Sequence, residues 1–517
     1  MLISCNLTDK NVNKKIIKFN SATGITSLDP AFARTQENIR AVNQLFNGLV
    51  QLDSQLNVVP SIAKNWSISD DGKTYNFVIN TGVFFHNHPV FKTSKREVNA
   101  SDFEYSFRRI INPTTASDGA WIFNDIIDKR QPFKAVNDTL FQIRLIKPFT
   151  PFLNMLTMAY CYVIPREVVE LYGDEFGKKP IGTGPFMFSN WADGIKLNLI
   201  RNPTYFESTE TNKIPKLDGI SIKFIQSKQT ELLEFIQGNL DLFTGIESSF
   251  KDEIISADRE LNKKYSNMFD LKISPFLNTE YLAFNMDDKS SPVHNINYRK
   301  AINYCIDRNA MVNYLRNGIG TPANGGFIPL GLPNHVNYDN PGYNLDLARK
   351  YLEASGVENG ESIKLTTTSN YLDLCILVQN NCAEIGIDIK IDVIPSSLLK
   401  QQKSAGELTF FRSSWIADYP DGENYMACFF GPNKAPNGPN YTRYSNTDFD
   451  IAYDSLINTS DIFKIGKLIS KLENKLRNDQ PFILLYYDQS VWLKNKKVKQ
   501  VEINPLNHLN LKSAYIK

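Results

Sequence analysis

The sequence has no long apolar run and no excess of either charge. No stretch of its 517 residues approaches the ~20 consecutive apolar residues that a membrane-spanning helix needs. The 57 Lys and Arg residues nearly balance the 55 Asp and Glu residues, and no basic stripe or block of like charge stands out. The chain therefore lacks the electrostatic footprint of a nucleic-acid-binding protein, and we expect no nucleic-acid partner.

The common motifs of catalysis are also missing. The chain has no G-x-x-x-x-G-K-[ST] phosphate loop, no G-x-G-x-x-G dinucleotide loop, no G-x-S-x-G nucleophile elbow and no H-E-x-x-H zinc helix. His86 and His88 could coordinate a metal, but no third ligand is near them in the sequence, so a turn-stabilising role is favoured. We therefore expect a binding protein that is not an enzyme and that uses no cofactor or metal.

Cysteine is scarce, with six residues in the chain. Leu2, Ile3 and Ser4 precede Cys5 as in a bacterial lipobox, whose Cys becomes the lipidated first residue of the mature protein. The charged part and most of the apolar part of a signal peptide do not precede it, so an accidental Cys is the alternative. The polar stretch that follows is typical of a flexible tether and favours lipidation. The other five Cys show no C-x-x-C or zinc spacing, so we expect buried free thiols.

The length predicts more than one lobe, because single hydrophobic cores stop growing at about 250–300 residues. Strands and helices alternate in two separate regions of the chain. In the second region, strands over 363–370 and 387–394 flank a helix over 372–385, which predicts a β-α-β unit with parallel strands. A long helix is expected from Tyr298 to Gly318. Two α/β lobes are therefore predicted.

The segment SSWIADYPDG, residues 413–422, combines an indole, a carboxylate and a phenol directly after Arg412. These are Trp415, Asp418 and Tyr419. The simple interpretation is a strand end followed by a turn at Pro-Asp-Gly. The alternative is a binding site that needs an acid and a base among aromatic rings, and the segment alone leaves both open.

The order of segments along the chain resembles the extracytoplasmic solute-binding proteins of family 5, the peptide- and nickel-type receptors of ABC importers. The resemblance runs from about residue 15 to the C-terminus. It rests on SLDP, LFNGLV, ASDFEYSFRRI, PIGTGPFMFSNW, FIQGNLDLF, YLAFNM, YRKAINYCIDRNAMV and SSWIADYPDGENYM, which occur in the order typical of the family.

The resemblance implies roles for Arg412 and for several residues of the SSWIADYPDG segment. Asp418 stands where the peptide-binding members pair an acid with the α-ammonium of the peptide. Arg412 stands where the oligopeptide-binding members hold the carboxylate of short peptides. The backbone from Ser413 to Ala417, with Trp415 and Tyr419 beside it, would pair with an extended peptide as an added strand. A nickel receptor would not need Asp418, which favours a peptide ligand.

Two further regions are implied more loosely to line the cleft. The loop after SLDP carries Arg34 and Gln36, which differ from the acidic and aliphatic residues of the oligopeptide receptors, so the resemblance leaves specificity there open. Asn278 lies just before YLAFN, and Tyr281 is the first residue of YLAFN; this region borders the cleft in relatives.

The resemblance also implies an α/β fold of the two-lobed periplasmic-binding-protein type II, with the extra subdomain of the peptide-binding class and a ligand cleft between the lobes. Residues 1–14 would be signal remnant and tether; 15–50, 180–268 and 482–517 would form one lobe, 51–179 the extra subdomain, and 269–481 the second lobe. GTGPF, residues 182–186, is expected to cross between the lobes as a hinge.

The implied function is a monomeric, lipid-anchored, periplasmic or cell-surface protein of a bacterium. It would capture peptides and deliver them to the permease and ATPase of an ABC transporter. The same fold binding another solute, such as a nickel chelate, an oligosaccharide or haem, is the alternative.

Overall fold

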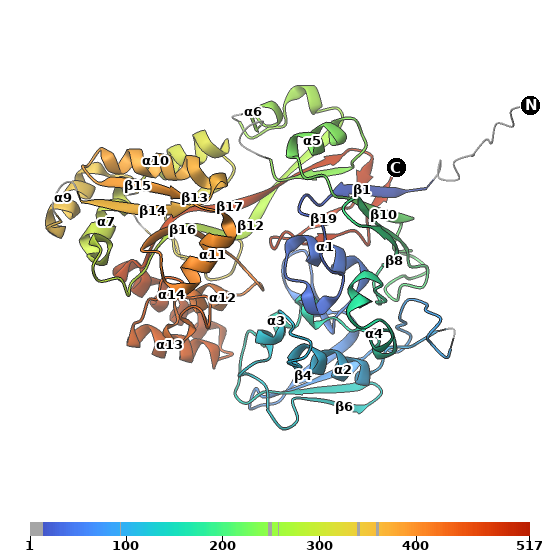
Figure 1. The fold of residues 1–517 in the computed structure, drawn as a ribbon. Helices are drawn as coiled ribbons and strands as arrows, with labels where there is room; N and C mark the ends of the chain where they lie inside the picture. Colours follow the sequence, from blue (N-terminus) through green and yellow to red (C-terminus); the bar gives the residue numbers. More distant parts are fainter. Residues whose placement is uncertain (1–13, 94, 247–250, 257, 339–341, 358–360) are drawn as a thin grey trace, which may run out of the picture.

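The computed structural model of the chain is a mixed α/β protein (Figure 1). It describes residues 14–93, 95–246, 251–256, 258–338, 342–357 and 361–517, so Cys5 lies outside the described residues. Three sheets of four or more strands organise the fold. We name them the β1 sheet, the β5 sheet and the β12 sheet after one strand of each.

The β1 sheet has the strand order β1-β10-β9-β8. β1 pairs in parallel with β10, and the other pairs are antiparallel. Alternate apolar residues such as Ile17 and Phe19 are buried beneath helix α1, as the period of a one-sided strand requires. The elements are β1 (Ile16–Asn20), β8 (Phe186–Ala192), β9 (Lys196–Arg201), β10 (Gly219–Lys223), α1 (Gln36–Leu45) and α5 (Lys228–Ile236).

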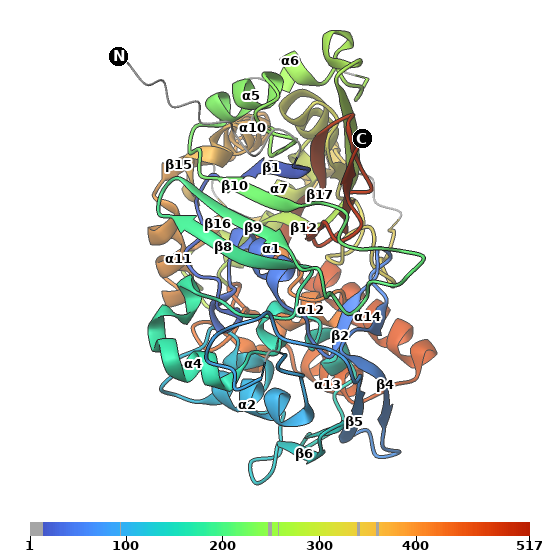
Figure 2. The same ribbon diagram turned by 90° about the vertical axis from the view of Figure 1, so that its right-hand side faces the viewer.

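The β5 sheet is an antiparallel sheet in the order β4-β5-β7-β6, and it lies below the β1 sheet in the view of Figure 2. Helix α2 packs on it through Phe103 and Phe107, which contact the rings of Phe133 and Phe141. These rings belong to a hydrophobic core that continues into residues of the β12 sheet. The elements are β4 (Ala63–Ile68), β5 (Thr74–Ile79), β6 (Phe133–Asn137), β7 (Leu140–Arg144), α2 (Ala100–Ile111), α3 (Phe152–Met155) and α4 (Arg166–Tyr172).

The β12 sheet has seven strands in the order β11-β17-β12-β16-β14-β15, with β13 beside β17. The predicted β-α-β unit is present, since β14 and β15 are parallel and α10 connects them. The strands are β11 (Leu242–Thr244), β12 (Phe269–Phe284), β13 (Thr321–Pro322), β14 (Ser362–Thr367), β15 (Asp388–Val393), β16 (Phe410–Ile416) and β17 (Phe482–Asn495). The helices on this side are α7 (Ile296–Cys305), α9 (Leu345–Ser355), α10 (Leu372–Ala383), α11 (Ser396–Ala405), α12 (Glu423–Met426), α13 (Thr447–Ile457) and α14 (Ile462–Asp479).

The β1 and β5 sheets with their helices form one half of the molecule, and most of the β12 sheet with its helices forms the other half. Strands β12 and β17 join these two halves (Figure 1). They have 16 and 14 residues, so each is roughly 50 Å long. One end of β17 pairs with β11, and its other end lies beside β12 close to β16. The predicted lobe limits remain a prediction. They place β17 in one lobe (482–517) and its strand partner β12 in the other (269–481).

The expectation that GTGPF is the crossing between lobes was wrong. Gly182 and Gly184 instead pack on the end of α1, where the N–H of Gly184 donates to Leu45 O at 2.8 Å. A Cβ at Gly182 would lie 2.0 Å from that same oxygen. Glycine is therefore required for the close approach of two backbones, so this segment is a site of tight packing and not a hinge.

The long helix expected from Tyr298 to Gly318 is interrupted. α7 ends at Cys305, and the chain turns before the short helix α8 (Arg308–Ala310) and a π-helical turn at Met311–Leu315. The Asp307 side chain accepts from the N–H of Ala310, so it begins a new helix where the apolar period alone predicts continuation.

The five cysteines that the structure describes are buried and unbridged, as predicted. Cys305 and Cys382, which are distant in sequence, have their Sγ atoms 3.1 Å apart. In the described part of the chain, no helix is long and apolar enough to span a membrane.

Candidate ligand-binding site

Strand β16 carries the SSWIADYPDG segment into the middle of the molecule. Along one edge it pairs with β12 from Phe410 to Ile416. Along its other edge β14 reaches only Phe410 and Phe411. From Arg412 to Ile416, that second edge therefore has no strand partner in the described residues. Unpaired backbone groups on such an edge are a template for an added strand.

Successive side chains of β16 point to opposite faces of the sheet. Ser413 and Trp415 lie on the same face as Tyr281 of β12, which is directly opposite Ser413 in the register. Arg412 lies on the other face. The strand thus places Arg412 and the indole of Trp415 on opposite faces of the sheet, although they are close in sequence.

Asp418 follows the end of β16 and is exposed to solvent in the space between the two halves. Its side chain has one close partner among the described residues, the amide of Asn424, which donates to Oδ2 at 3.4 Å. Surrounding protein restricts its hydration, and this desolvation raises the pKa of Asp418 to about 6. No Lys, Arg or His of the described chain forms an ion pair with it. The carboxylate is therefore accessible and lacks a cation.

Asn424 fixes the conformation of this segment. Its Oδ1 accepts from the indole Nε1 of Trp415 at 3.0 Å and from the backbone N–H of Asp418 at 3.1 Å. Because Asn424 is itself buried, both groups are held in place. Trp415 is half-buried and packs on the adjoining core.

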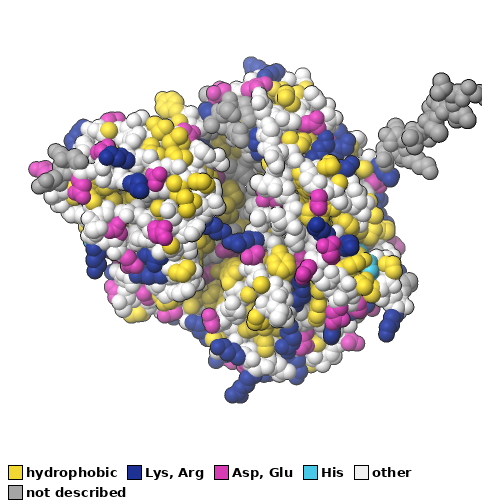
Figure 3. Space-filling model, viewed as in Figure 1, with side chains coloured by type: hydrophobic (Ala, Val, Ile, Leu, Met, Phe, Trp, Pro, Cys, Tyr) yellow, Lys and Arg dark blue, Asp and Glu magenta, His cyan; other side chains and the backbone are white. Residues whose placement is uncertain are grey.

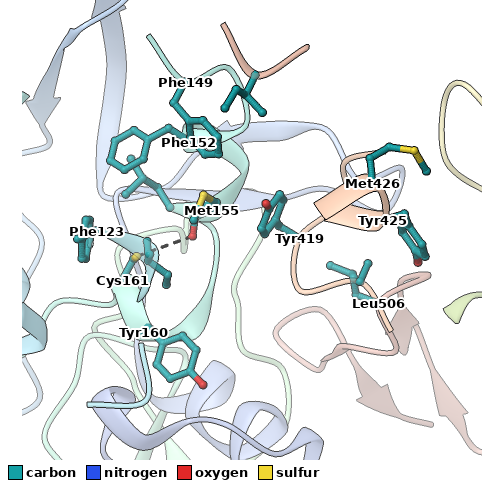
Figure 4. Packing of buried hydrophobic residues seen from close by; sticks show 14 of the residues in the cluster. Phe123, Phe149, Phe152, Met155, Tyr160, Cys161, Tyr419, Tyr425, Met426 and Leu506 are labelled. Carbon is teal, nitrogen blue, oxygen red and sulfur yellow. Dashed lines mark hydrogen bonds between the residues drawn. The ribbon is translucent and has the colours of Figure 1, made fainter. Parts of the chain in front are cut away.

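The wall that faces Asp418 across this space comes from the half of the molecule that holds the β1 and β5 sheets. Asp418 is close enough to Tyr160 to act on it electrostatically, as are Arg34 and Asp118. Arg34 and Asp118 form an exposed ion pair at 3.3 Å. Figure 4 shows Tyr160 on one side and Tyr419 on the other, and the space-filling view is hollowed between the two halves, with Lys or Arg side chains at the rim (Figure 3).

Arg412 already has an acidic partner. It is 8% exposed, forms an ion pair with Glu280 and stacks on the ring of Tyr371, with 3.2 Å from its guanidinium carbon to the ring centroid. Burial disfavours the charged guanidinium, but the carboxylate of Glu280 more than offsets this and raises the pKa of Arg412 further. A ligand carboxylate at Arg412 would share it with Glu280.

A cavity of about 870 Å³ lies in front of Tyr371. Thr244 and Asn507 line it from one half, and Tyr371 and Asp373 from the other. The floor includes Arg316 and Asp488, which form an ion pair at 3.0 Å. Because the ring of Tyr371 stacks on Arg412, this cavity lies on the Arg412 side of β16.

The remaining predicted residues are less accessible. Tyr281 is 2% exposed and packs on Phe327 and Phe482, so its ring belongs to the core. Asn278 is buried, and its amide donates to Glu280 and Asp488. The amide group of Gln36 donates to Leu506 O at 3.3 Å. 

Tyr419 and Ala417 are likewise engaged within the protein. The Tyr419 hydroxyl donates to Glu423 at 2.6 Å, and its ring stacks on Trp121 from the opposite wall, with 6.4 Å between centroids. The N–H of Ala417 donates to Leu277 O at 2.9 Å. These residues shape the end of β16, and the Tyr419 hydroxyl and the Ala417 N–H already have partners within the protein.

The turn-stabilising role predicted for His86 and His88 is seen for His88 alone, whose Nδ1 accepts from the N–H of Val90 at 3.2 Å, whereas His86 bonds to a distant segment. Nδ1 of His86 accepts from the N–H of Gly182 at 3.2 Å, and Nε2 lies 3.0 Å from Gly184 O. Nε2 of His88 lies 2.9 Å from the Tyr172 hydroxyl. Burial lowers the pKa of His86 to about 4, so its ring is neutral at ordinary pH. Among the described residues, no group of three or more His, Cys, Asp or Glu could hold a metal ion.

Residues 57–437 match the family model of the bacterial extracellular solute-binding proteins, family 5. The chain belongs to this family. The dipeptide-binding protein DppE of Bacillus subtilis is 23% identical to this family 5 protein over 98% of the chain and 92% of its own length. The haem-binding protein A of Haemophilus influenzae is 24% identical over 85% of the chain and 81% of its own length.

Solved structures agree with this assignment. DppA of Helicobacter pylori, an ABC transporter-associated periplasmic binding protein solved with the peptide STSA, superposes with a TM-score of 0.79 at 25% identity. The alignment covers 97% of this chain and 98% of that one. The predicted fold class is confirmed. The relatives are solute-binding proteins, so this family 5 protein is an extracellular solute-binding protein and not an enzyme.

Several residues of the site were missed by sequence reasoning. Glu280, Asn424, Tyr160 and Tyr371 contact or border the predicted residues but come from separate segments. Only Glu280 had a local signal, because it alternates with Asn278 on a strand whose polar positions face Arg412. The others depend on how distant segments pack in this family 5 protein.

Proposed function

We propose that this family 5 protein captures peptides between its two halves and delivers them to an ABC importer. In this proposal Asp418 pairs with the α-ammonium of the peptide, and the free edge of β16 pairs with its backbone. Charged termini and a backbone are common to all peptides, so a receptor that holds these groups tolerates varied side chains in wet pockets.

One observation carries the proposal: an accessible, cation-free carboxylate lies directly at the end of an unpaired strand edge. A carboxylate in a closed cleft is costly without a positive partner, and the α-ammonium of an added strand would supply one. The cavity in front of Tyr371 provides room for the rest of the peptide, with Arg412 behind that ring.

A different solute of the same family is the alternative, as the name of the haem-binding relative illustrates. A nickel chelate, an oligosaccharide or haem would use neither an α-ammonium partner nor the edge of β16. The combination of both features therefore favours a peptide.

A thermal-shift screen with peptides of graded length tests this function. Ligand that binds only the native state raises the melting temperature, so we expect an increase that depends on concentration for at least one length of peptide. A matched series of haem, nickel–histidine and oligosaccharides should leave the melting temperature unchanged. A shift with one of these and none with any peptide would refute peptide capture.

We also propose that Cys5 anchors the mature protein to a bacterial membrane, on the basis of the Leu-Ile-Ser-Cys segment. The diacylglycerol and amide-linked chains of a bacterial lipoprotein would supply the two or more acyl groups that stable anchoring needs. In a bacterium expressing the gene with a complete leader, labelled fatty acid should be incorporated, and Cys5→Ser should abolish the label. Equal labelling of both proteins would contradict the anchor.

A further inference from the structure

Helix α11 presents two lysines toward the space between the halves. Lys400 and Lys403 are one turn apart and therefore lie on the same side of the helix. Lys400 is close enough to Arg34 and Asp118 of the opposite wall to be influenced by both. This side of α11 consequently borders the same space as Asp418.

Lys403 lies directly beside the ligand-facing segment of β16. Its Nζ is 3.5 Å from Ser413 Oγ and 4.2 Å from the centroid of the Tyr441 ring. Tyr441 in turn is close enough to Asp418 and Arg34 to be influenced by both charges. Lys403 is thus a neighbour of the proposed peptide path and not part of a distant surface.

This ammonium has no carboxylate partner within ion-pair distance in the part of the chain that the structure describes, although Lys403 is half-buried. Burial lowers the pKa of Lys403 to about 8, and the charges of Arg412 and Lys400 act in the same direction. An unpaired, partly desolvated cation beside two other cations costs free energy. A negative group placed there would remove that cost.

We propose that Lys403, with Lys400 and Arg34 beside it, binds the carboxylate of an acidic side chain of the peptide, so that this protein prefers acidic peptides. The proposal rests on the proposed function, because it places the acidic residue in a peptide bound along β16. In an added strand, alternate side chains point to the two faces of the sheet. A side chain on the Ser413 face would meet Lys403.

A hydrogen bond to a charged group is worth more than one between neutral groups, and the neutral amide of Gln has nearly the shape of Glu. We therefore expect Glu to be preferred over Gln by about 10- to 100-fold at one position of the peptide. At the other positions, the two residues should bind alike.

Calorimetric titration of the full chain tests this with tetra-alanine and two sets of variants, which carry either Glu or Gln at each position in turn. Lys403→Met and Lys403→Gln should remove the preference for Glu at the selected position while tetra-alanine still binds. Lys300→Met is the matched control, because Lys300 is also half-buried and its Nζ lies over a Tyr ring, at 5.5 Å from the centroid of Tyr351, on α7. It should keep the preference.

Two results would overturn the inference. One is that every Glu peptide binds within about threefold of its Gln counterpart; the other is that both Lys403 variants keep the preference. In either case, binding of tetra-alanine would leave peptide capture itself standing. Failure of all these peptides to bind the unaltered protein, together with no thermal shift for a peptide of any other length, would instead refute the proposed function, and this inference with it.

Discussion

Asp418→Ala should weaken the binding of a free tripeptide by roughly 30- to several-thousand-fold. Removing one side of a buried charge pair costs about 2–5 kcal/mol, and ~1.4 kcal/mol is tenfold in affinity. The substitution would leave the α-ammonium in the closed cleft without its carboxylate, and the amide of Asn424, which donates to Asp418, cannot replace that charge. The loss should appear mainly as faster dissociation, which stopped-flow or surface-binding kinetics can measure.

An N-acetylated form of the same tripeptide is the control, because it lacks the positive charge. The unaltered protein should bind it poorly, and Asp418→Ala should discriminate far less between the free and acetylated peptides. Asp418→Asn keeps the shape of the side chain and should behave like the Ala variant. Equal affinity of the unaltered protein for both peptide forms would remove Asp418 from the ligand site.

The proposed pair of Asp418 and the peptide α-ammonium sets the pH dependence of binding. Desolvation raises the pKa of Asp418 to about 6 in the free protein, and only the ionised form attracts an ammonium. Affinity should therefore fall as pH decreases below about 6, by up to about tenfold per pH unit. It should fall again above about pH 8, where a peptide α-amine loses its proton. Asp418→Asn should lose the acidic limb of this profile.

Glu280→Ala should lower the free energy of unfolding by about 3–5 kcal/mol, because it leaves Arg412 buried without its carboxylate. Glu280 is 1% exposed and Arg412 is 8% exposed, so water cannot take the place of the lost partner. Equilibrium denaturation in urea measures the effect.

Two comparisons show whether the buried charge is the cause. Glu170→Ala removes an exposed ion pair with Arg166 and should cost less than about 1 kcal/mol. The double variant Glu280→Gln with Arg412→Met removes both charges and should recover much of the loss. If Glu280→Ala alone stayed within about 1 kcal/mol of the unaltered protein, the pair would not be the buried ion pair described above.

Local patterns in the sequence predicted much of the secondary structure. The β-α-β unit of β14, α10 and β15 follows from apolar periods of two and about 3.6 residues, which depend on neighbours along the chain. The same patterns failed between Tyr298 and Gly318, since one capping residue, Asp307, competes with the apolar period. They also failed at GTGPF, where glycine serves close packing on Leu45 and not flexibility.

The sequence by itself determined the strand end and the turn that carry Trp415 and Asp418, because such local structure depends on residues that are neighbours along the chain. It could not determine which charges have partners. The pairing of Arg412 with Glu280 follows from the register of β16 on β12, and the isolation of Asp418 and Lys403 follows from packing of both halves. A side chain's partners are fixed by which distant surfaces meet, and that is decided by the summed packing of three sheets and not by any one segment.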